Sequence, residues 1–107
     1  TSTAIIQDGE EIEKHIEDKA YIITLELDGK SLDSLTFAKV IDNTFSHYAS
    51  ITFVIGGSDG LSNKTKDRAN MALSFSSMTF PHQLFRVMLL EQIYRSYKIN
   101  NNETYHK

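Results

Sequence analysis

The sequence has no cysteine, no tryptophan and only one proline among its 107 residues. Without cysteine the chain can form neither disulfide bonds nor thiolate metal sites, which suits a reducing cytoplasm. Its four histidines are scattered without the HxxxH spacing of a metal site. No apolar run reaches the length of about 18 residues that a membrane helix needs, and the first residues do not resemble a secretory signal. We therefore expect a cytoplasmic protein with no metal and no membrane partner.

The length and composition predict one compact domain over residues 1–107. Hydrophobic residues make up 40% of the chain, which is enough for one core and too little for two. The chain begins with Thr1 rather than an initiator methionine. We expect it to be a fragment, a processed form or the ordered part of something longer.

The net charge of −3 is unevenly distributed along the chain. Residues 1–61 carry a charge of −7, from four basic and eleven acidic side chains. Residues 62–107 carry +4, from seven basic and three acidic side chains. A polyanion such as RNA would therefore approach the second half.

Strand-like and helix-like segments alternate along the chain. Residues 1–9 give no strong signal, and Asp28-Gly29 is typical of a turn. Ser31 or Ser34 can cap the helix that follows this turn. The patterns predict strands at 21–27, 51–55 and 72–76, and helices at about 10–19, 34–48, 62–71 and 83–98. This alternation predicts an α/β fold with a mostly parallel sheet flanked by helices.

Ligands of such sheets bind beyond the carboxyl ends of the strands, which here are the loops 26–30, 56–60 and 77–82. Gly56-Gly57-x-x-Gly60 follows a buried strand and would let a ligand approach the backbone, although a plain tight turn explains it too. It is neither a GxGxxG motif nor a P-loop. In the loop 77–82, apolar side chains would either clasp an adenine ring or simply anchor the loop.

The last predicted helix is apolar around most of its circumference, so its second face is expected to meet another subunit. Arg86, Glu91 and Arg95 interrupt this apolar surface. Glu91 and Arg95 are spaced as an intrahelical ion pair, and the sharper alternative is an arginine that faces RNA or a cofactor. Glu91 as a general base is less favoured. Tyr105 and His106 end a polar tail, where the histidine is either solvated or serves as a base or phosphate contact.

Five segments occur in the order and at the spacing of one known family, namely 24–30, 53–61, 73–83, 86–95 and 105–107. The chain resembles the RlmH family of the SPOUT class, the bacterial 23S rRNA pseudouridine N3-methyltransferases. The resemblance runs from about residue 9 to the end of the chain. Family members begin with further N-terminal residues, including a strand and a helix of the same sheet, so the chain is expected to be N-terminally incomplete.

This resemblance implies a C-terminal deep trefoil knot, here within about 51–107, and a homodimer formed through the C-terminal helix. It also implies that the knot binds S-adenosyl-L-methionine, the methyl donor. Carried over motif by motif, the cofactor-binding residues are Leu25, Gly56, Gly57, Phe75, Ser76, Ser77, Met78, Thr79 and Phe80.

The implied reaction is methyl transfer to N3 of a pseudouridine in 23S rRNA within the ribosome. Arg86 and Arg95 match the RNA-facing side of the family, and Tyr105-His106 matches a tail that reaches the partner subunit's site. His106, Tyr105 and Glu91 are the candidates for managing the proton of the base nitrogen. Two alternatives remain open: a SPOUT methyltransferase acting on tRNA, and a non-catalytic remnant that binds cofactor or dimerises.

Overall fold

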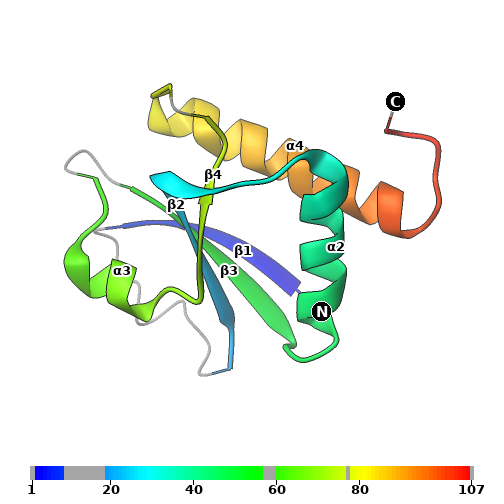
Figure 1. The fold of residues 1–107 in the computed structure, drawn as a ribbon, viewed down its shortest axis with the longest axis horizontal. Helices are drawn as coiled ribbons and strands as arrows, with labels where there is room; N and C mark the ends of the chain where they lie inside the picture. The colour runs from blue at the N-terminus through cyan, green and yellow to red at the C-terminus, as the bar shows by residue number, and fades with distance from the viewer. Residues whose placement is uncertain (1, 9–18, 57–59, 77, 107) are drawn as a thin grey trace.

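The structure is a computed structural model that describes residues 2–8, 19–56, 60–76 and 78–106, without the side chain of residue 82. Its strands and helices follow one another along the chain (Figure 1). In order they are β1 (Ser2–Gln7), β2 (Tyr21–Ser31), α2 (Ser34–Phe45), β3 (Ser50–Ile55), α3 (Asn63–Arg68), β4 (Met71–Ser74) and α4 (His82–Asn100). The helix predicted at about 10–19 lies outside the described residues, except for Lys19.

The four strands form one sheet in the order β1-β3-β2-β4, and every pair of neighbours is parallel. The predicted α/β fold with a parallel sheet is therefore confirmed. All six residues of β3 are buried, because this strand has a neighbour on each side and is covered on both faces. Its largely apolar sequence is what a central parallel strand requires.

Two hydrophobic clusters lie on opposite faces of the sheet. The larger one joins β-strand side chains to α2 and α4, which cover the same face, and consists of Ile23, Phe37, Ile41, Ile51, Phe53, Leu73, Leu89 and Ile93. The smaller one consists of Ile6, Ile22 and Val54, and Leu61 and Ala69 at the two ends of α3 pack against it. The alternation of Ile22 and Ile23 between the clusters follows from the two-residue period of a strand.

Helix α4 is attached to α2 by side chains as well as by the core. The Ser34 hydroxyl donates to Oε1 of Gln92 at 2.8 Å, and Nδ2 of Asn100 donates to the carbonyl of Ala38 at 3.1 Å. Ser34 is the first residue of α2 and Ala38 lies about one turn further on, so both contacts hold the N-terminal part of α2 against α4. Pro81 stands at the N-cap of α4, as its lack of an N–H group suggests.

The prediction that β2 ends at a turn at Asp28-Gly29 was wrong. The strand continues to Ser31, although its pairing is irregular: Leu73 of β4 pairs first with Leu25 and again with Lys30. Gly29 lies so close to β4 that an added Cβ atom would stand 2.7 Å from the carbonyl carbon of Leu73. Glycine is required here for close approach between strands rather than for a turn.

One strand was not predicted, and two further predictions need correction. Residues 2–7 form strand β1, which the sequence did not reveal because only Ile6 of this edge strand is buried. The N-cap of α2 is Asp33, not Ser31 or Ser34, because its carboxylate accepts from the Thr36 amide at 2.7 Å. Helix α3 ends at Arg68, and Met71 already belongs to β4.

Candidate functional site

A cavity of about 440 Å³ lies at the carboxyl edge of the sheet, between the ends of β2, β3 and β4. Its volume falls in the range of small-molecule sites, about 300–1,000 Å³. The bulged part of β2, the glycine turn after β3, helix α3 and the segment from β4 to α4 all contribute to its wall. The lining residues are Leu25, Glu26, Leu27, Asp28, Ile55, Gly56, Gly60, Leu61, Lys66, Leu73, Phe75, Ser76, Thr79, Phe80 and Phe85.

The apolar side of this cavity is built from three aromatic rings. The ring of Phe85 stands edge-on to Phe80, with 5.4 Å between their centroids, and lies 6.2 Å from the ring of Phe75. Leu25 and Leu73 add aliphatic surface beside these rings. Such a wall offers a flat apolar group a place to stack.

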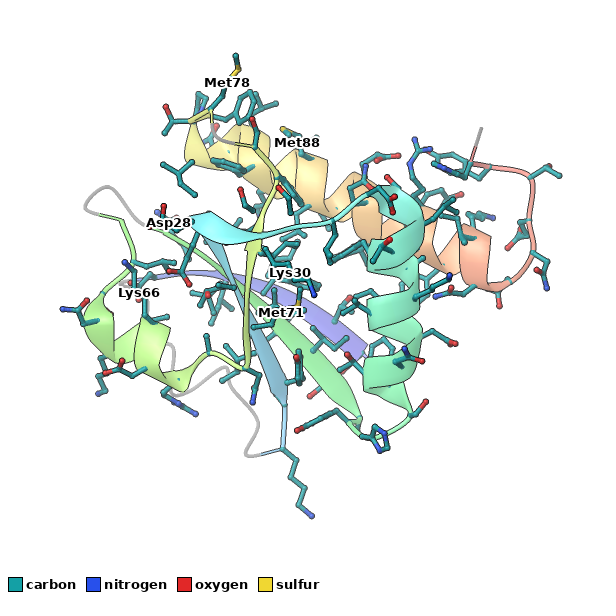
Figure 2. The ribbon with its side chains drawn as sticks, in the orientation of Figure 1. Asp28, Lys30, Lys66, Met71, Met78 and Met88 are labelled. Atoms are coloured by element: carbon teal, nitrogen blue, oxygen red, sulfur yellow. The ribbon has the colours of Figure 1, made fainter. Side chains whose placement is uncertain are left out.

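The wall of the cavity also carries charged side chains. Glu26 accepts a hydrogen bond of 2.6 Å from the Thr24 hydroxyl, which holds its carboxylate in place. Nζ of Lys66 lies 4.0 Å from Oε1 of Glu26, and the lysine side chain is 47% exposed, so this ion pair is open to solvent. Asp28 on β2 and Lys66 on α3 are labelled in Figure 2. The cavity therefore combines two carboxylates and one ammonium group with an aromatic wall.

The glycine turn lets backbone line the cavity on one side. Gly60 has a φ of +78°, which L-residues with side chains rarely adopt. A Cβ atom on Gly56 would stand 3.2 Å from the backbone of Gly60, so the backbone at the start of the turn lies close to the backbone at its end. Gly57, also predicted to bind cofactor, lies outside the described residues.

The structure brings together most of the residues predicted to bind cofactor. Six of the nine line the cavity: Leu25, Gly56, Phe75, Ser76, Thr79 and Phe80. Met78 does not, and its side chain is 71% exposed. Ser77 lies outside the described residues. The sequence did not single out Glu26, Asp28 or Lys66 as residues of this cavity. The first two lie in the expected ligand loop 26–30, which could have indicated them. No pattern in the sequence indicated Lys66.

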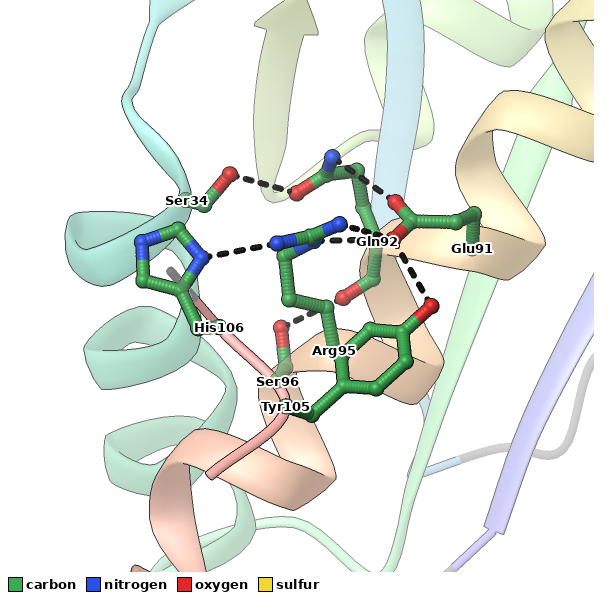
Figure 3. Close-up of polar contacts among 7 residues, drawn as sticks. All are labelled: Ser34, Glu91, Gln92, Arg95, Ser96, Tyr105 and His106. Carbon is green, nitrogen blue, oxygen red and sulfur yellow. Dashed lines mark hydrogen bonds and ion pairs between the residues drawn. The ribbon is translucent and has the colours of Figure 1, made fainter. Parts of the chain in front are cut away.

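The three candidates for proton management form a second site, away from this cavity (Figure 3). Oε1 of Glu91 accepts from Nε of Arg95 at 2.8 Å and from the Tyr105 hydroxyl at 3.4 Å. Nη1 of Arg95 lies 2.9 Å from Nδ1 of His106. The hydrogen bond from Arg95 to Glu91 raises the pKa of Arg95 above its usual value. We call Glu91, Arg95, Tyr105 and His106 the tail cluster.

The tail cluster forms because the chain reverses after α4. Asn102 has a φ of +58°, a conformation that asparagine tolerates better than most residues. The amide of Glu103 then donates to the carbonyl of Lys98 at 2.8 Å, and the Glu103 carboxylate pairs with Nζ of Lys98 at 2.9 Å. The reversal lays Tyr105 against Tyr94, with ring centroids 5.1 Å apart.

The two arginines predicted to face RNA lie in different surroundings. Arg86 is exposed, and its Nη2 donates to the carbonyl of Ile5 in β1 at 3.3 Å. Arg95 is only 24% exposed in its side chain and belongs to the tail cluster. The expected intrahelical pair between Glu91 and Arg95 is present, with Nη2 and Oε1 2.6 Å apart.

Helix α4 exposes a continuous apolar surface opposite the core. Its members follow one another at intervals of three or four residues, so they share one face of the helix. They are Leu84, Val87, Leu90, Tyr94 and Tyr97, with exposures between 38% and 62%. We call these residues the α4 seam.

Within the described part of the chain, no three His, Asp or Glu side chains are grouped so that they could hold a metal ion. Among the same residues, no helix is long and apolar enough to cross a membrane.

The parallel sheet, the cavity at its carboxyl edge and the long final helix agree with a comparison against protein families. The family described as "Predicted SPOUT methyltransferase" matches residues 1–106. The chain belongs to the SPOUT methyltransferase family.

Individual relatives are similar over nearly the whole chain. It is 54% identical over 102 residues to "Ribosomal RNA large subunit methyltransferase H" of Clostridium botulinum, and 53% identical over 102 residues to the protein of the same name from Clostridium tetani. Each match covers 94% of this chain and 64% of the relative. A protein of Methanococcus vannielii, "Putative ribosomal RNA large subunit methyltransferase H", is 53% identical over 107 residues, 99% of this chain and 67% of the relative.

Proposed function

We propose that this chain carries the cofactor-binding part of an S-adenosylmethionine-dependent methyltransferase that acts on N3 of a pseudouridine in 23S rRNA of the large ribosomal subunit. The observation that carries the proposal is the sequence identity of 53–54% to relatives named as large-subunit rRNA methyltransferases. The chain spans 64% of the length of the Clostridium relatives, so activity, substrate and partners are all part of the proposal.

The cavity at the carboxyl edge fits the chemistry of S-adenosylmethionine. An adenine ring needs a flat apolar surface, which Phe75, Phe80 and Phe85 provide. The sulfonium and the ammonium group of the cofactor are cations, and Glu26 and Asp28 are carboxylates on the cavity wall. The carboxylate of S-adenosylmethionine can pair with Lys66 on α3. The residues present therefore suit this cofactor.

The bound cofactor supplies an electrophilic methyl group. The contribution of the chain is to hold the two reactants in line and to favour the base nitrogen in its deprotonated form. Glu91, Tyr105 and His106 stay the candidates for the second task, with Arg86 and Arg95 on the RNA-facing side. None of these five side chains lines the cofactor cavity of its own chain. This part of the proposal therefore needs the substrate to bridge two sites, or the tail of one protomer to reach the partner's cavity.

We further propose that residues 51–107 form the trefoil knot within one domain, and that the protein works in the cytoplasm as a homodimer. Support for the dimer comes from the α4 seam. Five large apolar side chains on one exposed helix face are typical of a protein–protein contact. A second copy of the same helix offers a surface of the same chemistry.

Two measurements test the proposed function. Isothermal calorimetry of the chain with S-adenosylmethionine should give heat of binding, and no heat would contradict the cofactor assignment. Large ribosomal subunits and tRNA are then each incubated with the chain and methyl-labelled cofactor. We expect label on 23S rRNA only, and mass spectrometry should place it on a pseudouridine. Label only on tRNA would replace the substrate by the tRNA alternative.

A further inference from the structure

The tail cluster contains a contact that decides how His106 can act. A guanidinium group has five N–H donors and no acceptor. Because Nη1 of Arg95 lies 2.9 Å from Nδ1 of His106, Nδ1 must be the acceptor. A neutral imidazole carries one proton, so the proton is on Nε2. The free nitrogen of this side chain is therefore a hydrogen-bond donor.

We propose that Arg95 is a positioning residue that fixes His106 as a hydrogen-bond donor through Nε2, directed at an oxygen acceptor of the nucleotide substrate. The proposal rests on the proposed function, and it gives His106 a different task from the removal of a proton. It includes no proton transfer by His106.

Arg95 can position another side chain because it is itself held on several sides. Its Nε and Nη2 both contact Oε1 of Glu91, at 2.8 and 2.6 Å. Its guanidinium carbon lies 5.0 Å from the centroid of the Tyr105 ring, so the ring of the residue next to His106 covers it. Two anchored neighbours leave the guanidinium little freedom to turn.

The support extends to α2 through a chain of hydrogen bonds (Figure 3). Nε2 of Gln92 donates to Oε2 of Glu91 at 3.0 Å, and Oε1 of Gln92 accepts from the Ser34 hydroxyl at 2.8 Å. Ser34 is the first residue of α2. The orientation of His106, on a tail beyond α4, is thus tied to the two helices that cover the sheet.

The acceptor is most simply an oxygen of the substrate base. No member of the tail cluster lines the cofactor cavity of its own chain, so a cofactor bound there is not the acceptor. When N3 of a pseudouridine loses its proton to water, negative charge spreads onto the two carbonyl oxygens beside it. A fixed donor aimed at such an oxygen stabilises the anion without accepting the proton, in the manner of an oxyanion hole.

The positioning step is tested by ¹⁵N NMR of the histidine-labelled chain, which needs no activity. In the wild type at neutral pH, Nδ1 of His106 should be unprotonated and Nε2 protonated. In Arg95→Met the His106 shifts should move toward those of His47, which is exposed and serves as the internal reference. Arg95→Lys should move them less. A proton on Nδ1 in the wild type, or unchanged shifts in Arg95→Met, would overturn the assignment.

The donor role is tested by methyl transfer to large ribosomal subunits. Removal of a preorganised donor typically costs about 10²–10³ in kcat, and we expect this of His106→Ala and Arg95→Met, with cofactor KM changed less than about twofold. His106→Gln keeps an N–H group near the position of Nε2 and should retain activity within about tenfold of wild type. His47→Ala, which removes an exposed histidine outside both sites, is the control.

The outcomes separate the two proposals. If His106→Gln is as inactive as His106→Ala, and loses a rising limb of the pH–rate profile that the wild type shows, His106 is a base and the donor role is wrong. If the wild type binds cofactor but transfers no methyl group to RNA, the proposed function and the substrate part of this inference fail together. The NMR measurement then still decides whether Arg95 positions His106.

Discussion

Asp33 closes the first turn of α2 by accepting from the Thr36 amide, and this bond lowers the pKa of its carboxyl below the ordinary value of 3.8. The stabilisation is therefore complete above that value and is lost as the pH falls through the lower, folded pKa. In urea unfolding, Asp33→Ala should have a lower free energy of unfolding than wild type at pH 7. This difference in free energy should become smaller below pH 3.8. Asp33→Asn, which keeps a capping oxygen, should stay close to wild type at pH 7. A gap for Asp33→Ala that is the same at every pH would contradict this.

Gly29 and Gly60 are glycine for two different structural reasons, close packing at Gly29 and a positive φ at Gly60. A Cβ atom at Gly29 would lie 2.7 Å from the backbone of Leu73, which has little room to move, whereas one at Gly60 meets nothing within 4 Å. Gly29→Ala should cost about 1–3 kcal/mol in the free energy of unfolding through overpacking. Gly60→Ala should cost about 1–2 kcal/mol through its positive φ alone. Thermal unfolding of both variants checks this, and no loss of stability in Gly29→Ala would show that β2 and β4 can separate there.

Phe80 and Met78 lie in the same loop, but of these two only Phe80 lines the cavity that we propose binds the cofactor. Stacking of a base on an aromatic side chain is worth about 1–3 kcal/mol by alanine substitution. Phe80→Ala should therefore weaken S-adenosylmethionine binding by about tenfold or more in calorimetry. Met78→Ala, the matched control, should leave the affinity unchanged. Equal effects of the two substitutions would count against the position of the adenine ring.

At the level of elements, the two faces of α4 have different tasks. Leu89 is fully buried in the larger core cluster, so Leu89→Ala should lower the free energy of unfolding by about 2–5 kcal/mol. Leu35 on α2 is 51% exposed, and Leu35→Ala should change the free energy of unfolding by less than about 0.5 kcal/mol. Urea unfolding monitored by circular dichroism compares them. A small effect of Leu89→Ala would mean that α4 is not anchored to the sheet.

The elements also show what the sequence could predict. The ends of strand β3 and helix α4 were predicted to within two residues, because continuous apolar runs and helical periodicity are strong local signals. Strand β1 was missed, since its hydrogen bonds to β3 are made with residues far along the chain and leave little pattern in its own sequence. The sequence singled out each member of the tail cluster as a candidate, but not that the four side chains meet. Their assembly depends on the reversal at Asn102, which no local pattern indicated.

For the whole molecule, the proposed homodimer makes the α4 seam its most sensitive surface. Leu90→Glu places a charge in the middle of the seam, where burial without a partner is unfavourable. Sedimentation velocity should show a dimer for the wild type and a monomer for Leu90→Glu. Leu35→Glu, on an exposed part of α2 outside the seam, should stay dimeric. A wild type that sediments as a monomer at micromolar concentration would exclude the dimer.

The parallel sheet also has a consequence for how the chain reaches its native state. Ser2 pairs with Ser50, and Ile23 pairs with Met71. None of the strand pairs among the described residues joins segments close in sequence. Each pairing must close a long loop before it gains a hydrogen bond, which slows folding. During synthesis β1 emerges well before its neighbour β3, at roughly 5–20 residues per second. For that interval its row of backbone donors and acceptors has no partner in the sheet, and a chaperone that binds extended segments would find it there.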